Sequence, residues 1–359
     1  MRNWPDWVAG ESAAVEAAGQ WRRIRDLDDG LVSFASNDYL GLSQHPTVVA
    51  AAHAALDRWG AGAGSARLVA GSRAVHTDLE AALAAWKQEP AALLFPTGYA
   101  ANLGVLATFA HRGARVLSDE RNHASIVDGC RLSSAEVCVY RHGDVEHVEE
   151  LLAAWSGPAV VVTDTVFSMD GDVAPVTDLA ELCHARGALL VLDEAHAVLG
   201  PGADLAGVDH LRVGTLSKHL GSLGGFVAGP GAFVELLVNR ARPFVYTTAP
   251  SPADAAAGLA SVGVLRSPEG AALVERLRSN VEGVAPGHPS PILPVVVGDE
   301  RAAVDASAAL LALGLLVPAI RPPTVAPGTS RLRISISATH TDSQLAALLA
   351  GLAGVGCAP

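Results

Sequence analysis

The sequence predicts an α/β fold in which a mostly parallel central sheet is flanked by helices, followed by a smaller α+β domain. Two observations support this prediction. Short, continuous apolar runs alternate with amphipathic stretches through the first two thirds of the chain, the pattern of βαβ units. The apolar runs lack the polar alternation of half-exposed strands, so we expect them to be buried on both faces of a parallel sheet.

The large domain is predicted to contain seven strands. In chain order they cover residues 92–96, 114–118, 135–140, 159–164, 188–194, 211–217 and 224–229. A helix is predicted before them over residues 76–86, and further helices between them over 122–133, 144–155 and 176–187, the last closing on Gly187. The last two runs are too close for a crossover helix, so we expect an antiparallel strand there.

The pattern changes after Pro252. Two helical stretches lead to a proline-rich joint over residues 285–294, and three short β-rich runs and two further helices follow. This mixture is typical of an α+β domain. We therefore predict three parts: an N-terminal segment over residues 1–35, a large α/β domain over 36–265 and a C-terminal domain over 266–359.

Composition excludes several classes of protein. Lys plus Arg total 25 against 37 Asp plus Glu, a net charge of −12, and no lysine-rich run occurs, so nucleic acid is not an expected partner. The apolar stretch 306–320 is shorter than the ~20 residues that span a bilayer, so no membrane association is expected.

The N-terminal residues and the cysteines indicate a cytoplasmic protein. Asp6 and Glu11 interrupt the N-terminus before any apolar segment develops, so we do not expect a secretory signal. The four cysteines form no C-x-x-C pair and no zinc-type spacing with histidine. A reducing compartment, the cytoplasm, is therefore expected.

The chain has two lysines, Lys87 and Lys218. Lys87 ends an amphipathic helix beside Gln88 and Glu89, so we expect it to be a solvent-exposed surface residue. Lys218 lies in a segment of small residues directly after a predicted strand. Chemistry that requires a lysine therefore has two candidates, of which Lys218 is favoured.

Polar residues follow the carboxyl ends of several predicted strands, where open α/β sheets bind their ligands. Each has an ordinary structural explanation by itself, such as capping a turn or a helix. Their convergence on one edge predicts a functional cleft. The residues are Thr97, Gly98, Asp119, His123, Ser168, Asp170, Asp193, Glu194, His196, Thr215, Ser217 and Lys218.

Two other interpretations of this cleft are weaker. The tetrad DEAH at 193–196 resembles the acidic box of a helicase-type ATPase, but neither lysine lies in the required G-x-x-x-x-G-K-[ST] loop. A metal site formed by Asp193, His196 and His123 would not have one of the strong zinc spacings. We expect neither an ATPase nor a metal.

The favoured interpretation is a Schiff-base site for pyridoxal 5'-phosphate. Lys218 would hold the aldehyde, and the Asp193 carboxylate would keep the pyridine nitrogen protonated, which makes the ring an electron sink. Thr97, Gly98 and Tyr99 open a predicted helix whose N-terminal amides suit the phosphate, to which Thr215 adds a hydroxyl.

The chain resembles the α-oxoamine synthases, which are fold type I pyridoxal phosphate enzymes. The resemblance extends over nearly everything from Phe34 onward, and its last segment is similar to the oxononanoate-forming branch in particular. The matching segments are SNDYLGL (36–42), GAGSARLVAG (62–71), FPTGYAANLGVL (95–106), NHASIVDG (122–129), VFSMDGDVAP (166–175), LDEAHAVLG (192–200), TLSKHLG (215–221) and RPPTVAPGTSRLRISISATH (321–340).

The resemblance implies a role for each matched residue. Lys218, His123 and Asp193 are implied to be catalytic. The implied cofactor-binding residues are Gly98, Tyr99, His123, Ser168, Asp193, His196, Thr215, Lys218 and, from the neighbouring subunit of a homodimer, Thr248. Arg333 is implied to bind the amino-acid carboxylate and Thr324 the acyl substrate, and Asn37 also lies among the implied substrate residues.

The activity implied by the resemblance is the decarboxylative condensation of L-alanine with pimeloyl-CoA, or with its carrier-protein form. The products would be 8-amino-7-oxononanoate, CoA and CO₂, in biotin synthesis. Lys218 would be the general base. Another acyl thioester or glycine as substrate, a fold type I aminotransferase and a non-catalytic homologue are the alternatives.

Two departures from the family pattern concern the acyl donor. No basic residue lies between Pro5 and Gln20, where relatives carry a substrate-binding arginine, and the nearest substitutes are Arg2, Arg22, Arg23 and Arg25. The turn AVLG after His196 is also shorter than the family's usual one. The identity of the acyl donor is therefore left open by the sequence.

Overall fold

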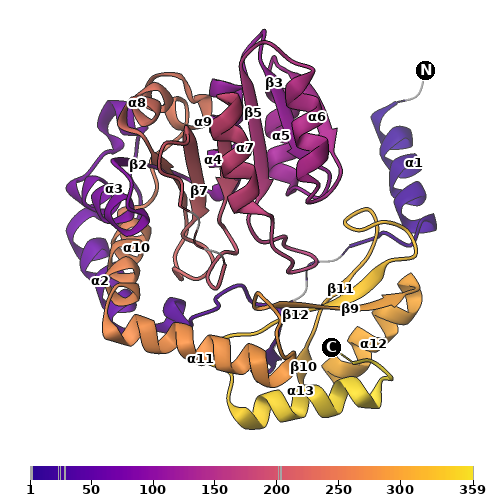
Figure 1. Ribbon diagram of the computed structural model, residues 1–359. Coiled ribbons are helices and arrows are strands. Elements are labelled where there is room, and N and C mark those ends of the chain that lie inside the picture. Colours follow the sequence, from indigo (N-terminus) through magenta and orange to yellow (C-terminus); the bar gives the residue numbers. More distant parts are fainter. Residues whose placement is uncertain are drawn as a thin grey trace.

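A seven-stranded sheet forms the centre of the larger part of the molecule (Figure 1). The computed structural model describes residues 3–22, 24, 26–27, 30–200, 202 and 204–358. The sheet has the order β2-β8-β7-β6-β5-β3-β4. Its strands are β2 (Ala91–Phe95), β3 (Arg115–Asp119), β4 (Glu136–Tyr140), β5 (Ala159–Asp164), β6 (Leu189–Asp193), β7 (His210–Thr215) and β8 (Gly225–Gly229).

Each of these strands corresponds to a predicted apolar run, and the predicted α/β class is confirmed. Strand β8 pairs antiparallel with both β7 and β2, while the pairs among β3 to β7 are parallel. The antiparallel strand expected at this position is therefore present. The short connection from Thr215 to Gly225 leaves no room for a crossover helix.

Helices cover both faces of the sheet. On one face, α4, α5, α8 and α9 pack against side chains such as Val160 and Val162 of β5. On the other face, Val161 packs with α6 and α7, while α2, α3 and α10 cover the β2–β8 end. Successive residues of β5 therefore enter opposite cores, which explains its continuous apolar sequence.

The predicted helices are present to within a few residues, whereas α1, α2, α8 and α9 were not predicted. Helix α7 ends at Arg186, and the following Gly187 has a φ of 63°, the left-handed conformation expected at a helix C-terminus. The helices are α1 (Trp4–Ala17), α2 (Pro46–Trp59), α3 (Ala74–Lys87), α4 (Gly98–Phe109), α5 (Ala124–Leu132), α6 (Val145–Ala153), α7 (Val176–Arg186), α8 (Gly231–Arg240), α9 (Arg242–Val245), α10 (Pro252–Leu265), α11 (Pro268–Val284), α12 (Glu300–Ala312) and α13 (Asp342–Gly354).

The C-terminal part is built around an antiparallel sheet of order β11-β12-β9, with α11, α12 and α13 beside it (Figure 1). These strands are β9 (Ile292–Gly298), β11 (Ala319–Ile320) and β12 (Ser330–Ser335). The segment from β1 (Val32–Ser33) to Leu42 joins this part: β1 pairs with β10 (Leu315–Leu316), and Phe34, Tyr39 and Leu42 enter the same core. The domain boundaries after residues 35 and 265 stay predictions.

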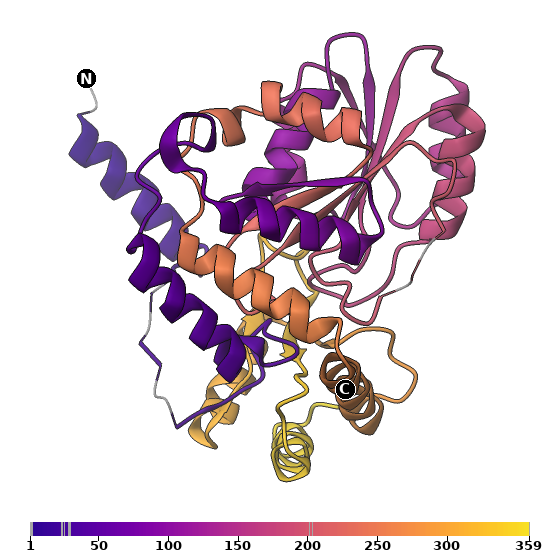
Figure 2. The same ribbon diagram turned by 90° about the vertical axis from the view of Figure 1, so that its left-hand side faces the viewer.

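Helix α1 projects from the body of the molecule in both views (Figures 1 and 2). None of its residues is buried, and its aromatic side chains Trp4 and Trp7 are 76% and 47% exposed. Arg2, Arg23 and Arg25, three of the arginines considered above, lie outside the described residues. Among the described helices, none is long and apolar enough to cross a membrane.

Candidate active site

A cavity of about 240 Å³ lies at the carboxyl ends of β5, β6 and β7, beside the start of α4. Nine of the residues singled out in the sequence line this cavity. They are Thr97, Gly98, Tyr99, His123, Asp193, His196, Thr215, Ser217 and Lys218. The structure therefore brings together predicted residues from four separate segments of the chain, whereas Asp119, Ser168, Asp170 and Glu194 do not line this cavity.

Asp193 ends β6 and is held rigidly at the floor of the cavity. Its side chain accepts hydrogen bonds from the backbone N–H of Ala195 at 2.9 Å and from the Asn102 amide at 2.6 Å. Asp193 is 6% exposed. A buried carboxylate with two fixed donors is well suited to hold a cationic partner at one position.

Two residues that the sequence analysis missed extend this arrangement to His123. The Asn102 amide also donates to Ser125 Oγ at 2.9 Å, and Ser125 Oγ lies 2.8 Å from His123 Nδ1. The backbone N–H of Ser125 donates to the same Nδ1, so that nitrogen carries no proton. Asn102 thus positions both the Asp193 carboxylate and the His123 ring. The sequence did offer one signal for Asn102, because it is a polar amide in the otherwise apolar stretch AANLGVL.

The opposite wall consists of backbone and hydroxyl groups. Thr97 caps α4 by accepting from the Ala100 N–H at 3.0 Å, and the helix then opens at Gly98. A Cβ at Gly98 would lie 3.3 Å from Thr215 Cβ, which shows how closely the two segments approach. Thr215 Oγ1 and Ser217 Oγ are 2.7 Å apart. This wall matches the needs of a phosphate group.

Tyr99 contributes to this wall through its position at the start of α4. Its side chain points to another partner: the hydroxyl donates a hydrogen bond to Asp128 on α5. The hydrogen bond to Asp128 raises the pKa of the Tyr99 phenol above its ordinary value. A contact between Tyr99 and a phosphate would therefore come from its backbone N–H rather than from the phenol.

Lys218 lies in the loop after β7 and lines the cavity. Burial lowers its pKa below the ordinary value, and the Arg333 cation acts in the same direction, against the Asp193 and Asp164 carboxylates. A lowered pKa increases the fraction of neutral amine, the form that attacks an aldehyde or accepts a proton.

Asp164 ends β5 and is the third buried group of this electrostatic cluster. Burial and the nearby Asp193 charge raise its pKa well above the ordinary value. Its side chain accepts the backbone N–H of His123 at 2.7 Å, so it fixes the start of α5. Burial lowers the pKa of His123 itself, which keeps that ring neutral near pH 7.

His196 connects the cavity to the predicted substrate residues. Its Nδ1 lies 2.7 Å from the Tyr39 hydroxyl, which donates to Asn37 Oδ1 at 3.1 Å. The guanidinium of Arg333 donates to the same Asn37 oxygen at 3.1 Å. Burial, reinforced by the Lys218 and Arg333 cations, lowers the pKa of His196 well below its usual value.

Ser168 and Arg333 lie beside this network rather than among the residues that line the cavity. The Arg333 Nε donates to the carbonyl oxygen of Ser168, and its Nη1 donates to Ser335 Oγ at 2.9 Å. Arg333 is 5% exposed. Its side chain is therefore already oriented by the protein before any substrate carboxylate arrives.

Thr324 lines a different and larger cavity, of about 820 Å³. Its walls include Asn122 and Phe167, so it adjoins the segments that carry His123 and Ser168. Gln20 also borders it. The chain on both sides of Gln20 is held by the Arg321 guanidinium, which donates to the Gly19 carbonyl at 2.6 Å and to the Trp21 carbonyl at 3.2 Å.

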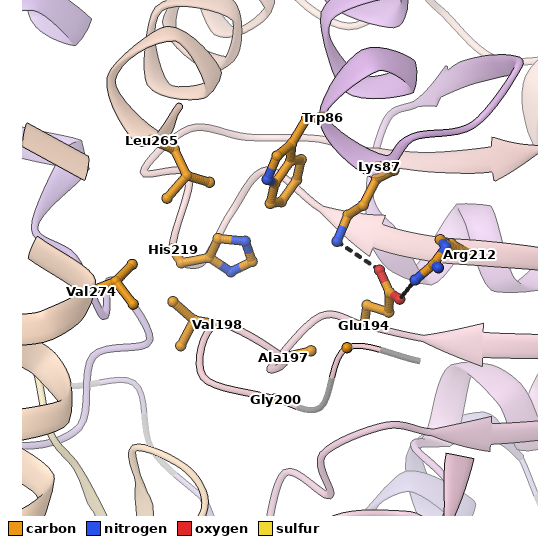
Figure 3. Close-up of a pocket in the computed structure, with 11 residues that line it drawn as sticks. Trp86, Lys87, Glu194, Ala197, Val198, Gly200, Arg212, His219, Leu265 and Val274 are labelled. Carbon is orange, nitrogen blue, oxygen red and sulfur yellow. Dashed lines mark hydrogen bonds and ion pairs between the residues drawn. The ribbon is translucent and has the colours of Figure 1, made fainter. Parts of the chain in front are cut away.

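The predicted exposure of Lys87 is wrong. Its Nζ lies 2.6 Å from Glu194 Oε2 and 4.0 Å from the centre of the Trp86 ring, and the side chain is 15% exposed (Figure 3). Arg212 binds the other oxygen of Glu194 at 2.5 Å and Glu89 at 2.9 Å. The end of α3 packs onto the sheet here, a long-range contact that helix periodicity does not reveal.

This ion-pair network also explains Glu194, the second acidic residue of the DEAH tetrad. Burial raises the pKa of Glu194, but the Lys87 and Arg212 cations outweigh it and hold the pKa below its ordinary value. Glu194 is therefore an anion that joins α3, β6 and β7. Lys87 is committed to a structural pair, which leaves Lys218 as the lysine of the cavity.

The donor set of the cavity fits the predicted pyridoxal 5'-phosphate. It offers an amine on Lys218, a buried carboxylate on Asp193 and, at the start of α4, a wall of hydroxyl and backbone groups around the close approach of Gly98 to Thr215. These match an aldehyde, a protonated pyridine nitrogen and a phosphate, in that order. Each functional group of the cofactor thus has a complementary group in the cavity.

Comparisons with known proteins agree with this fit. The family model for class I and II aminotransferases matches residues 29–352. A protein named 8-amino-7-oxononanoate synthase from Anaeromyxobacter dehalogenans is 48% identical over 383 residues, which cover 98% of this chain and 95% of that protein. A protein of the same name from Methylobacterium sp. is 45% identical over 373 residues, covering 98% and 97%.

Solved structures with the same architecture belong to related enzymes. A serine palmitoyltransferase from S. paucimobilis, with bound PLP and myriocin, has a TM-score of 0.90 at 29% identity and covers 99% of this chain and 98% of its own. The 8-amino-7-oxononanoate synthase from Francisella tularensis has a TM-score of 0.73 at 26% identity, with coverages of 89% and 96%.

Proposed function

Because the chain belongs to the class I and II aminotransferase family and, within it, to the 8-amino-7-oxononanoate synthases, we propose that this cavity condenses L-alanine with a pimeloyl thioester. The enzyme is a pyridoxal phosphate-dependent acyltransferase of the α-oxoamine synthase type, with fold type I architecture. The observation that carries the proposal is the meeting of Lys218, Asp193 and His123 in one cavity.

When bound, pyridoxal phosphate supplies an electron sink for negative charge at the α-carbon of the amino acid. Lys218 would hold the cofactor's aldehyde, and its Nζ would accept the α-proton of the bound alanine. Its lowered pKa favours the neutral amine that this task requires. The Asp193 carboxylate, whose position is fixed by the Asn102 amide, would bind the protonated pyridine nitrogen.

The remaining residues orient the reactants. Arg333 binds the alanine carboxylate, and its guanidinium is preoriented by Asn37, Ser168 and Ser335. His123 would stack on the cofactor ring, and its lowered pKa favours a neutral imidazole, which would add no positive charge there. Because the folded protein already holds these side chains in place, the free-energy cost of ordering them arises during folding and not during the reaction.

We assign the acyl donor to the second cavity, lined by Thr324. Apolar walls from Phe167, Met169 and Val325 suit an acyl chain, and the cavity adjoins the segment that carries His123. In the overall condensation, the α-carbon of alanine would lose its proton and bond to the thioester carbonyl carbon, the C–S bond would break to release CoA, and the alanine carboxylate would leave as CO₂. Each molecule of product is therefore formed with the release of one CoA and one CO₂.

An assay of acyl donors against amino acids tests this function. We expect pimeloyl-CoA with L-alanine to release CoA and CO₂ in equal amounts, faster than acetyl-CoA or with glycine or serine. Free thiol and CO₂ are measured in the same reaction, and pimeloyl-carrier protein is compared with pimeloyl-CoA. Preferred turnover of glycine with acetyl-CoA, or transfer of an amino group to a 2-oxo acid without CoA release, would contradict the proposal.

The active enzyme is proposed to be a homodimer in which Thr248 contacts the cofactor phosphate of the neighbouring subunit. Thr248 is exposed and lies outside the residues that line the cavity of its own chain. Beside it lies an apolar surface, in which Tyr246, Leu68 and Val69 are 72%, 53% and 80% exposed. Such a surface is typical of an interaction site.

Light scattering of the purified protein tests this assembly, with an expected mass of twice the 36.7 kDa chain. Thr248→Ala is expected to weaken cofactor binding by about tenfold, the usual effect of losing one hydrogen bond to a charged group. A fully active monomer would contradict the shared site.

A cytoplasmic location is part of the same proposal, and the four cysteines, all free thiols, support it.

A further inference from the structure

A histidine outside the cavity joins the edge of the sheet to the hairpin that carries Ser168. His142 follows β4, and its Nδ1 lies 3.0 Å from Asp119 Oδ1, while its Nε2 lies 2.5 Å from Asp172 Oδ2. The ring packs edge-on against Phe167 with centroids 4.4 Å apart. His142 thus bridges two carboxylates that come from different parts of the chain.

The Asp119 side of this bridge is rigid. Asp119 ends β3, is 2% exposed and also accepts the backbone N–H groups of Arg121 at 2.8 Å and of Gly143 at 2.9 Å. These bonds tie its carboxylate to the two turns that follow β3 and β4. The position of Asp119 is therefore set by the sheet.

The Asp172 side belongs to a hairpin between the two parts of the molecule, residues 166–173. Val166 and Val173 pair across it, and Ser168 and Asp170 at its tip contact Arg333 and Arg331 of β12. The Ser168 carbonyl is one of the groups that orient the Arg333 guanidinium. A shift of the hairpin would therefore move a support of the proposed alanine-binding residue.

The two bonds of His142 require a protonated ring. A neutral imidazole has one N–H and can donate to one carboxylate, whereas the imidazolium donates to both. Burial lowers the pKa of His142, but hydrogen bonds and charges from Asp119 and Asp172 outweigh it and raise the pKa above its ordinary value. The charged groups that act on His142 are Asp119 on β3 and Asp172 in the hairpin. Beyond them, Tyr140 on β4 and Asp164 on β5 interact with Asp119, and Arg121 in the turn after β3 pairs with Asp170 of the hairpin.

We propose that His142 is a positioning residue that holds the 166–173 hairpin, and through it Arg333, in the geometry that binds alanine. This inference rests on the proposed function, because Arg333 is taken as the receptor of the alanine carboxylate. As the pH rises through the raised pKa of His142, the ring loses its proton and one of the two bonds. The KM for alanine should then increase, while the steps after binding change little.

The test compares His142→Gln with the wild-type holoenzyme between pH 6 and pH 9. A glutamine side chain has no charge to lose, so we expect the KM for alanine at low pH to rise about tenfold, with kcat changed less than threefold. In the wild-type enzyme the KM for alanine should rise with pH as His142 loses its proton. This rise should be absent from the variant. His184→Gln, which changes an exposed histidine bonded to the Gly207 carbonyl, is the matched control with unchanged kinetics.

A second variant keeps the inference falsifiable if His142→Gln does not fold. Asp172→Asn removes one charge from a side chain that is 40% exposed, and it should raise the alanine KM similarly. The double variant should be no worse than either single one, because both changes break the same bridge. Wild-type KM values and pH profiles in these variants would overturn the inference.

A measurement that needs no turnover separates this inference from the proposed function. The ring of His142 can be titrated by NMR in the holoenzyme, with an expected pKa above 6.5 that falls in Asp172→Asn. Alanine binding can be followed separately by the change in cofactor absorbance, without an acyl donor. Failure of the acyl assay alone would then contradict the proposed function, whereas an unshifted His142 pKa would contradict the bridge.

Discussion

Lys218→Ala should abolish covalent attachment of pyridoxal phosphate and reduce turnover by at least about 10²–10⁴-fold, the contribution of a positioned proton-transfer group. The loss is expected because two roles are proposed for this one amine, holding the aldehyde and accepting the α-proton. The fold should be retained, because Lys218 lies in the loop after β7 and an alanine keeps the backbone carbonyl that accepts the Gly221 N–H. Turnover, cofactor absorbance and thermal unfolding measure these three effects separately.

Borohydride reduction of the wild-type holoenzyme identifies the same amine directly. After reduction and peptide mapping, the pyridoxyl group should be on Lys218. The matched control is Lys87→Arg, which keeps a cation beside Glu194 and should retain the label and near wild-type turnover. Label on Lys87, or on neither lysine, would refute the mechanism.

Asp193→Asn should leave the protein folded and reduce turnover by about 10²–10⁴-fold. An asparagine oxygen can still accept the Ala195 N–H, so the local backbone should persist. The charge opposite the pyridine nitrogen is lost, and removing one member of a buried ion pair costs about 3–5 kcal/mol. The direct measurement is the exchange of the alanine α-proton with deuterated solvent, followed by NMR without an acyl donor.

Controls for this variant use other carboxylates of the chain. Asp305→Asn changes an exposed residue on α12, paired with Arg301 across one helical turn, and should exchange the α-proton at the wild-type rate. A wild-type exchange rate in Asp193→Asn itself would show that Asp193 does not keep the ring cationic. Loss of exchange together with loss of folding would instead assign Asp193 a structural role.

Much of the fold could be predicted because its signals are local. Continuous apolar runs mark strands such as β5, whose alternate residues enter two different cores, and Gly187 marks the end of α7. The antiparallel strand β8 followed from the length of one connection. The order of the strands in the sheet was not predicted, because it depends on which strands pair over long distances.

The candidate site was predictable to the extent that strand ends meet at one edge. Lys218, Asp193 and His123 line one cavity for that reason. Asn102 and Ser125 were missed because an amide or hydroxyl on a helix has no sequence signature for the long-range bonds it makes. Lys87 was misjudged for a related reason: its partner Glu194 lies 107 residues away in the chain.

The substrate residues show a different limit. Arg333 and Asn37 meet across 296 residues, and only the packing of the N-terminal segment onto the C-terminal core brings them together. The family resemblance implied that both residues bind substrate, but the sequence around each of them did not indicate that they contact each other. The role of each in substrate binding stays a prediction.

The buried pair of Lys87 and Glu194 gives the protein an unusual surface chemistry. One lysine is committed to this pair and the other to the cofactor cavity, so the cationic side chains that remain available to solvent are guanidinium groups. Reagents and modifying enzymes that act on lysine side chains therefore find their two targets inside the folded structure. A protease specific for lysine would divide the chain into residues 1–87, 88–218 and 219–359, with each cut requiring a part of the core to open first. The rate of cleavage at these two positions would therefore measure local unfolding at the end of α3 and at the active site.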